Sequence, residues 1–141
     1  MTFRKGGRTK QYEKWFINGE PLEVVSVYKY LGLLFSNTLS WSKAVHTLSL
    51  QAKKATNMLI QSSIKCGGFS VAVAFELFDK MIVPVATYGA EIWGAKQYKE
   101  IEAIQIYYSK KILGLPIQTS NNAVLGECGR MGLYHLCVKV Y

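Results

Sequence analysis

A chain of 141 residues, of which 50% are hydrophobic, is long enough to bury one core, and this composition excludes an intrinsically disordered protein. The 17 lysine and arginine residues outnumber the 9 acidic ones, and the formal net charge of +8 favours a polyanionic partner such as nucleic acid over a small neutral substrate. The three cysteines lack CxxC spacing, which indicates free thiols in a reducing compartment, and the basic start differs from a secretory signal peptide. We therefore expect one folded unit inside the cell, in the nucleus or the cytoplasm, and not a secreted protein.

Residues 1–14 form a basic stretch around Gly6 and Gly7. Such a stretch offers contacts to phosphates without reading bases, but a run of charges is equally often a solvated loop. The sequence leaves both interpretations open. The cations of this stretch are Arg4, Lys5, Arg8, Lys10 and Lys14.

Strand signals follow the basic stretch. The dipeptide Asn18-Gly19 suits the two positive-φ positions of a tight turn, so it predicts a β-hairpin with a first arm at Trp15–Ile17 and a return arm at Leu22–Val25. Pro21 lies near this turn, where a missing backbone donor is tolerated.

A second β-rich stretch, Val27–Phe35, predicts a further strand. Its alternation places Tyr28, Tyr30, Gly32 and Leu34 on one side. A glycine inside a strand marks either a bulge or the close approach of another backbone or a ligand. On spacing alone, a bulge at Gly32 is favoured.

The clearest helix pattern runs from Trp41 to Lys65. Its apolar residues recur at steps of four and three, and they are Trp41, Val45, Leu48, Ala52, Ala55 and Leu59. The far side carries no acidic residue, and a face of one charge sign favours anion binding. His46 has no second ligand one turn away, so it is better explained as a surface residue than as a metal ligand. The far-side residues are Lys43, His46, Lys53, Lys54, Asn57, Gln61 and Lys65.

After Gly67-Gly68 ends that helix, the stretch Ser70–Gly94 is the expected central helix. Its two apolar stripes cover most of the circumference, so we expect other helices to surround it. Pro84 predicts a kink or break at the preceding residue, and Gly89 the close approach of a neighbour. Charged residues interrupt the stretch and disfavour a membrane span. The stripes are Phe75, Phe78, Ile82, Val85, Gly89 and Trp93, and beside them Leu77, Met81, Tyr88 and Ile92.

Helical patterns continue to the end of the sequence. Tyr98–Leu113 predicts a third helix and Asn121–Cys128 a short one. Leu133–Tyr141 begins an apolar helical pattern that stops without a cap, which suggests that a longer parent protein continues. The cysteine and histidine residues of this end match no common zinc-ligand spacing. The inward residues of the third helix are Ile101, Ile104, Tyr108 and Ile112.

The sequence contains no recognisable catalytic constellation. A two-metal polymerase or nuclease needs converging carboxylates, and the sole aspartate, Asp79, lies within the expected central helix. There is also no GxSxG motif and no glycine-rich phosphate loop. We expect no catalytic residue, no metal ligand and no cofactor in this chain.

Five segments follow one another in a distinctive order. They are FRKGG at Phe3–Gly7, WFINGEPLEVV at Trp15–Val25, YKYLG at Tyr28–Gly32, LSW at Leu39–Trp41 and IVPVATYGAEIWG at Ile82–Gly94. Each is weak alone, but the ordered set covers nearly the whole chain and is rather specific. Together they resemble the end of a reverse transcriptase from non-LTR, LINE-type retrotransposons.

This resemblance implies that residues 1–36 are the end of the palm, with a primer-grip-like hairpin, and that residues 37–141 are a helical, thumb-like region. It implies that Tyr30, Leu31 and Gly32 support the primer terminus, which favours close approach over a bulge at Gly32. The basic helix would lie against the template–primer duplex. The catalytic aspartates of the family belong to an F/YADD-type motif without a counterpart here, and the parent polymerase would use Mg²⁺.

Two hypotheses follow. The first is a fragment of an RNA-directed DNA polymerase that binds an RNA/DNA template–primer duplex. Its other expected partners are the fingers and palm of the parent protein, and no membrane partner is expected. The second is a small basic helical protein-interaction module with no nucleic-acid role. The expected fold is α+β, mostly α, with a short N-terminal β-hairpin or three-strand piece before a helical bundle. The candidate nucleic-acid-binding residues are Arg4, Lys5, Arg8, Lys10, Lys43, Lys53, Lys54, Asn57, Gln61 and Lys65.

Overall fold

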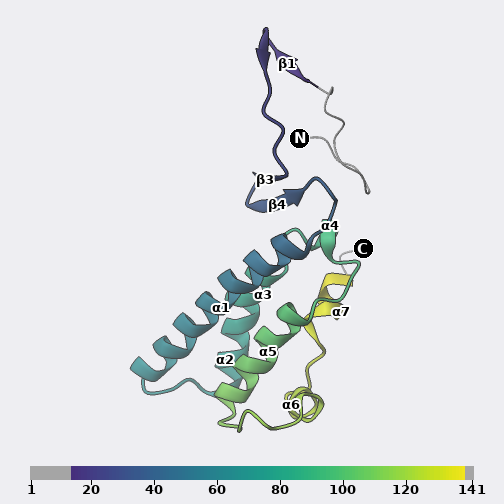
Figure 1. Cartoon of the computed structure of the whole chain (residues 1–141). Helices are drawn as coiled ribbons and strands as arrows, with labels where there is room; N and C mark the ends of the chain where they lie inside the picture. The colour runs from purple at the N-terminus through teal and green to yellow at the C-terminus, as the bar shows by residue number, and fades with distance from the viewer. Residues whose placement is uncertain (1–13, 139–141) are drawn as a thin grey trace. The chain divides into compact units, whose positions relative to one another are not determined.

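Short antiparallel strands precede a series of helices in the computed structural model, which describes residues 14–138 (Figure 1). The chain divides into two compact units, residues 1–44 and 45–141. The strands lie in the first unit, and most of the helical residues lie in the second. The predicted fold class, α+β and mostly α with N-terminal strands before a helical region, is therefore confirmed.

The first hairpin forms at the predicted turn. Strand β1 (Phe16–Ile17) pairs with β2 (Glu20–Pro21), and Asn18 and Gly19 between them have φ values of 50° and 85°. The return arm is shorter and begins earlier than Leu22–Val25. Pro21 pairs with Phe16 at a position that makes no ladder bond, so its missing N–H is tolerated, and the pairing continues beyond it with Leu22 N donating to Trp15 O over 2.7 Å.

The second β-rich stretch is a hairpin and not a single strand. Strand β3 (Val27–Tyr30) pairs with β4 (Leu33–Ser36), and the register joins Tyr30 to Leu33. Leu31 and Gly32 form the turn between them, with φ values of 46° and 87°. The predicted bulge is therefore wrong, because Gly32 supplies a left-handed turn position and no strand runs through it.

This turn also changes which side chains share a face of the hairpin. Tyr28 pairs with Phe35, and Lys29 pairs with Leu34. Directly opposed residues lie on the same face, so Leu34 is on the opposite face from Tyr28. The prediction that these two residues share one side is wrong for the same reason, because the chain reverses between them.

Helix α1 (Ser42–Lys65) follows the predicted seam. Val45, Leu48, Ala52 and Leu59 are buried, as the steps of four and three predict. The helix ends at Gly67 and Gly68, where φ is 80° and 98°, and Gly68 N donates to Ser63 O over 2.8 Å. The glycine pair thus stops α1 as predicted.

The expected central helix consists of four consecutive segments, of which the first three are continuous. They are α2 (Val71–Leu77), the π-helical turn η1 (Phe78–Ile82), α3 (Val83–Ala86) and α4 (Ala90–Trp93). Near Val83, where Pro84 predicts a kink or break, the helix instead continues through the π turn: Val83 N donates five residues back to Phe78 O, and the wide turn accommodates a ring that a regular helix would exclude. Gly89, at a left-handed φ of 67°, separates α3 from α4.

The π turn also decides which side of this segment is buried. From Ala74 to Ala90 the buried residues recur at steps of four, as Ala74, Phe78, Ile82, Ala86 and Ala90, and Trp93 is buried three residues further on. Of the second predicted stripe, Met81 is 54%, Tyr88 48% and Ile92 47% exposed. The prediction that helices surround this segment on most of its circumference is therefore wrong on that side.

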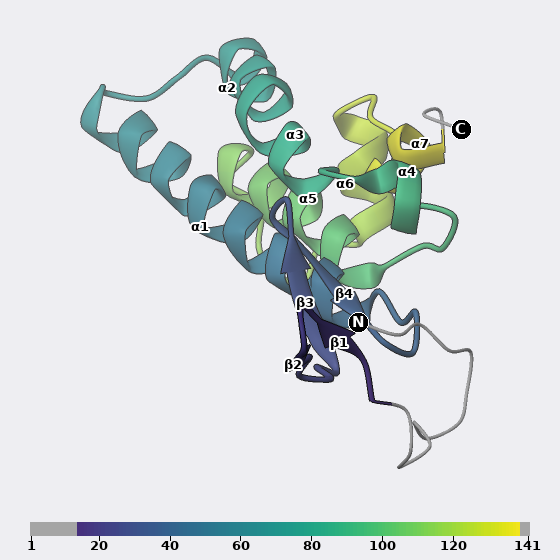
Figure 2. The same ribbon diagram turned by 90° about the horizontal axis from the view of Figure 1, so that it is seen from above.

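Helix α5 (Lys99–Ile112) runs beside α1 in both ribbon views (Figures 1 and 2). Its predicted inward residues Ile101, Ile104 and Tyr108 are buried. Tyr108 joins α5 to the broken segment, because its hydroxyl donates to Ala74 O over 2.7 Å and its ring stacks on Phe78 at 4.7 Å.

Two short helices, α6 (Asn121–Glu127) and α7 (Leu133–Val138), complete the described part of the helical unit. The Glu102 carboxylate of α5 accepts hydrogen bonds from Leu133 N at 3.1 Å and Tyr134 N at 2.6 Å. It therefore caps the first turn of α7 from a neighbouring helix. A Cβ on Gly132 would lie 2.6 Å from Glu102 Oε2, so a side chain there would displace the carboxylate from this capping position.

Candidate nucleic-acid interface

The predicted site residues are distributed over different parts of the chain. Arg4, Lys5, Arg8 and Lys10 lie outside the described residues. The primer-grip-like residues Tyr30, Leu31 and Gly32 are exposed at the turn between β3 and β4. The remaining candidates all belong to α1, which is the only element in the described range that carries several of them.

The cations of α1 are exposed, as a solvent-facing basic side requires. No carboxylate within residues 14–138 pairs with Lys53, Lys54 or Lys65. Lys54, Gln61 and Lys65 follow one another at steps of seven and four, so they lie in one row along the helix. Exposed cations without acidic partners remain available for phosphate oxygens.

The side of α1 that faces α5 differs from this row. His46 Nδ1 lies 3.0 Å from Oε2 of Glu100 on α5, and Ser49 Oγ donates to the same oxygen over 3.3 Å. Lys53 lines a groove of about 450 Å³ together with these three side chains. The sequence of α1 contains no acid, but the fold supplies one on this flank.

Asn57 also belongs to the flank that faces α5. Its Oδ1 accepts a hydrogen bond from the Tyr107 hydroxyl at 3.1 Å, and the residue is half-buried. Asn57 therefore fixes an aromatic side chain of α5. Gln61, one turn further along α1, is exposed.

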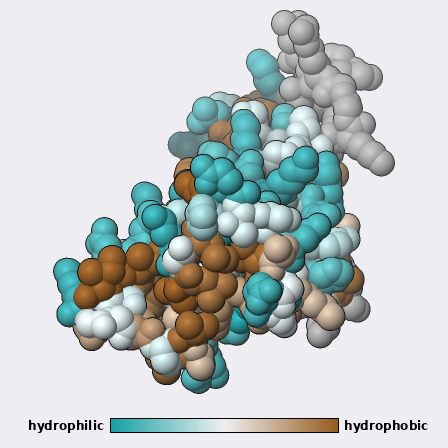
Figure 3. Space-filling view, turned by 90° about the horizontal axis from the view of Figure 1, so that it is seen from below, coloured by the Kyte–Doolittle hydropathy of each residue, from teal (hydrophilic) through white to brown (hydrophobic). Residues whose placement is uncertain are grey.

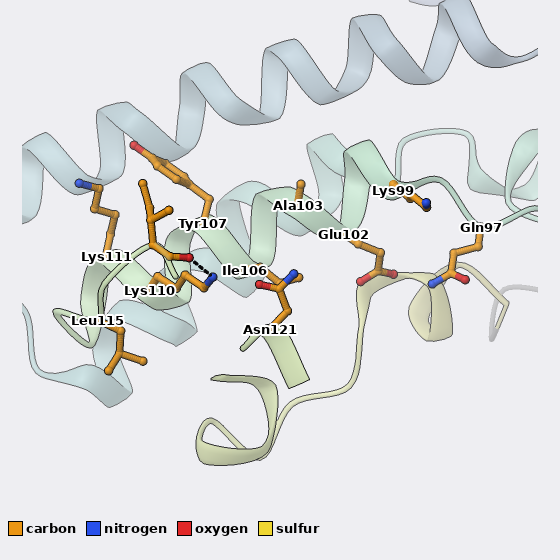
Figure 4. A pocket seen from close by; sticks show the side chains of 11 residues that line it. Gln97, Lys99, Glu102, Ala103, Ile106, Tyr107, Lys110, Lys111, Leu115 and Asn121 are labelled. Atoms are coloured by element: carbon orange, nitrogen blue, oxygen red, sulfur yellow. Dashed lines mark hydrogen bonds between the residues drawn. The ribbon is translucent and has the colours of Figure 1, made fainter. Parts of the chain in front are cut away.

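A larger groove, of about 680 Å³, lies on the other side of α5 (Figure 4). Lys110 Nζ donates to Ile117 O over 2.8 Å across this groove. Tyr107 lines this groove as well as the smaller ones beside α1, and Lys111 borders two of the three. Tyr107 and Lys111 were not among the binding residues predicted from the sequence. Tyr107 lies outside the inward stripe of α5, and this position was the available sign that it faces the surface.

The only aspartate of the chain has a structural role. Both carboxylate oxygens of Asp79 accept hydrogen bonds from the Arg130 guanidinium, which lies over the ring of Phe75 at 5.0 Å. Residues 14–138 contain no group of three His, Cys, Asp or Glu side chains that could hold a metal ion. The described residues therefore do not fit the Mg²⁺ site that the resemblance to a polymerase implies.

Burial raises the pKa of half-buried Tyr98, and two fully buried packing residues also have raised pKa values. The pKa of Tyr108 is raised to about 12, mainly by burial. The charge of Arg130 opposes this increase, and the charge of Asp79 adds to it. Burial, and then the neighbouring Glu102, raise the pKa of the Cys137 thiol. Both groups therefore stay protonated at neutral pH, Tyr108 as a hydrogen-bond donor and Cys137 as a core residue.

No helix between residues 14 and 138 combines the length and the hydrophobicity that crossing a membrane requires. Comparisons of the chain with protein-family models, with curated proteins and with solved structures found no match.

Proposed function

We propose that this chain binds an RNA/DNA template–primer duplex, as a palm-end and thumb-like fragment of a non-LTR retrotransposon reverse transcriptase. The observation that carries the proposal is the set of exposed cations on α1, Lys53, Lys54 and Lys65, none of which forms an ion pair with a described carboxylate. The net charge of +8 supports it, because a polyanion is the natural partner of such a chain. The resemblance of the ordered motifs described above supports the choice of family.

The geometry of α1 suits a contact with phosphates. Lys54 and Lys65 are eleven residues apart, which corresponds to about 16 Å along a helix. The phosphates of a duplex recur every few ångströms along its axis, so two cations on one row of a helix at this spacing can each meet a separate phosphate. Phosphate contacts of this kind supply affinity and orientation and do not select a sequence.

The proposed role is binding without chemistry. The described residues offer no converging carboxylates for a two-metal reaction, so extension of a primer would depend on the fingers and palm of the parent protein. Those parts and the duplex are the proposed partners.

The test is the double variant Lys53→Ala with Lys54→Ala. It should weaken duplex binding about equally for all sequences and reduce the slope of log affinity against log salt by about two counterions. Fluorescence anisotropy at several salt concentrations measures both quantities. Lysine and alanine have similar helix propensities, so the loss would reflect charge.

A matched control removes two other exposed cations of the helical unit, with Lys80→Ala and Lys96→Ala. This pair has the same effect on net charge and should leave the salt slope nearly unchanged. If the α1 double variant keeps full affinity and slope while Arg4→Ala and Lys5→Ala abolish them, the nucleic-acid surface is the N-terminal stretch and not α1.

The protein-interaction module remains the second candidate, because hydrophobic side chains gather on one face of the molecule (Figure 3). Around the connection between α1 and α2, Ile64 is 73%, Val71 47% and Val73 46% exposed. Salt separates the two candidates: phosphate binding weakens steeply as salt is added, whereas apolar docking does not.

A further inference from the structure

One groove of the helical unit differs in chemistry from its neighbours. It has a volume of about 580 Å³ and lies between the C-terminal half of α1, the connection to α2 and the end of α5. None of its lining residues is acidic, whereas Glu100 and Glu102 line the two other grooves. The side chains that decide its chemistry are Asn57, Gln61, Ile64, Phe69, Tyr107 and Lys111.

Hydrogen bonds hold the side chain of Tyr107 and the backbone of Phe69, the two aromatic residues of this groove. The Tyr107 hydroxyl donates to Asn57 Oδ1 over 3.1 Å, which fixes the ring against α1. The backbone N–H of Phe69 donates to Ser63 Oγ over 3.1 Å, directly after the glycine pair that ends α1. An aromatic wall whose geometry is set before a ligand arrives loses little conformational entropy on binding.

The polar groups of the groove are amides and one cation. With its oxygen bonded to Tyr107, Asn57 keeps its amide N–H groups as donors, and Gln61 offers a donor and an acceptor. Lys111 is exposed and lies one helical turn after Tyr107, and both side chains project from α5 towards α1 (Figure 4). Aromatic rings, amides and a single ammonium group match a nucleobase with its phosphate.

We propose that this groove binds one unpaired nucleotide of a strand that extends beyond the duplex, with its base against Phe69 and Tyr107 and its phosphate at Lys111. The inference rests on the proposed function, because the same helix α1 carries the cations assigned to the duplex. It adds a preference for a duplex with a single-stranded end over a blunt one.

The experiment compares three kinds of RNA/DNA hybrid probe in fluorescence anisotropy: a blunt duplex, the same duplex with a three-nucleotide thymidine overhang on its DNA strand, and that overhang with abasic sites. Both the 3′ and the 5′ overhang are tested. Stacking of one base on an aromatic side chain gives about tenfold tighter binding, so one overhang should bind about tenfold more tightly than the blunt duplex. The abasic overhang should lose most of this gain, because it keeps the phosphates and lacks the bases.

Two variants locate the effect. Phe69→Ala should remove most of the gain from the overhang and leave binding of the blunt duplex unchanged, whereas Lys111→Gln, which removes only the phosphate contact, should remove a smaller part of the gain. Ile117→Ala is the matched control, because Ile117 is 79% exposed and lines the groove on the other side of α5. Circular dichroism of each variant establishes that its helices are intact.

The outcomes separate this inference from the proposed function. Equal affinity for all three probes, with salt-dependent binding of the blunt duplex, would overturn the nucleotide groove and leave duplex binding standing. An overhang gain that both groove variants keep would also overturn it. Failure to bind any probe at low salt would overturn both proposals. Binding of an acidic, leucine-containing helical peptide but of no hybrid probe, lost in Phe69→Ala, would assign the groove to a protein partner instead.

Discussion

Between Lys14 and Ser40 the only large apolar side chain that is buried is Leu33, whereas the helical unit buries Phe78, Ile82 and Tyr108 completely. In the first region Trp15, Phe16 and Ile17 are more than half exposed, and the two hairpins take their shape from turns with positive φ. A two-stranded hairpin is marginally stable by itself. The difference teaches that turn chemistry determines the shape of the N-terminal region, and tertiary packing that of the helices.

The comparison is tested most strongly by one phenylalanine from each region. Phe78→Ala should destabilise the helical unit by about 3–5 kcal/mol, because it leaves a cavity beside Tyr108. Phe16→Ala removes the same atoms from a side chain that is 59% exposed and should cost less than about 0.5 kcal/mol. Urea unfolding followed by circular dichroism measures both. Equal effects would contradict the comparison.

The contact between α5 and α7 gives the next largest effect. Glu102→Ala removes the acceptor of two backbone N–H groups and should cost about 1–2 kcal/mol. Glu100→Ala, on the same helix, removes a carboxylate that is about half exposed and should cost less than about 1 kcal/mol. Hydrogen exchange of the Leu33 and Leu133 amides would separate a local loss of α7 from any change in the hairpins.

Tyr108 makes the helical unit sensitive to alkaline pH. Its folded pKa of about 12 exceeds the ordinary value of 10.0, so its contribution to stability is complete below pH 10 and is lost as pH rises towards 12. Tyr108→Phe should cost about 1 kcal/mol at neutral pH through the lost bond to Ala74. It should also flatten the fall of the urea midpoint above pH 10. An unchanged alkaline slope in this variant would show that Tyr108 is not the group responsible.

The hairpin turns provide the smallest effect, with opposite signs at matched positions. Leu31 and Asn18 occupy the same place in their two turns, with φ values of 46° and 50°. Asparagine tolerates this conformation better than leucine, so Leu31→Asn should stabilise its hairpin by about 0.5–1 kcal/mol. Asn18→Leu should destabilise the other hairpin by a similar amount. Backbone NMR shifts of the paired strand residues follow both changes, and the same sign at both positions would refute the turn assignment.

These contrasts explain which features were predictable. Asn18-Gly19, the glycine pair after α1 and Pro84 act within a few residues of themselves, so their effects could be predicted from local sequence. The inward stripe of α5 was predictable for the same reason. Leu31-Gly32 forms an equivalent turn, but leucine rarely adopts the positive φ that the first turn position needs. The dipeptide therefore gave no turn signal, and the alternation around it suggested a continuous strand.

Contacts between distant residues could not be predicted in this way. Glu100 reaches His46 across 54 positions, Glu102 caps a helix 31 positions away, and Arg130 pairs with Asp79 across 51. None of these pairs leaves a periodic signal. The candidate cations of α1 were identified from their spacing, but the acidic flank and the nucleotide-sized groove beside them depend on where α5 packs.

The π turn at Phe78–Ile82 has a consequence for how the length of this chain can vary. Ala74 and Ala86 are both fully buried and are twelve residue steps apart, whereas three ordinary α turns need about eleven. The segment therefore contains one residue more than its buried face requires. Loss of Met81, which is exposed, would leave both alanines on the same face as the turn closes to ordinary α geometry. A one-residue deletion elsewhere in a helix, such as α1, would instead rotate every following side chain by about 100°.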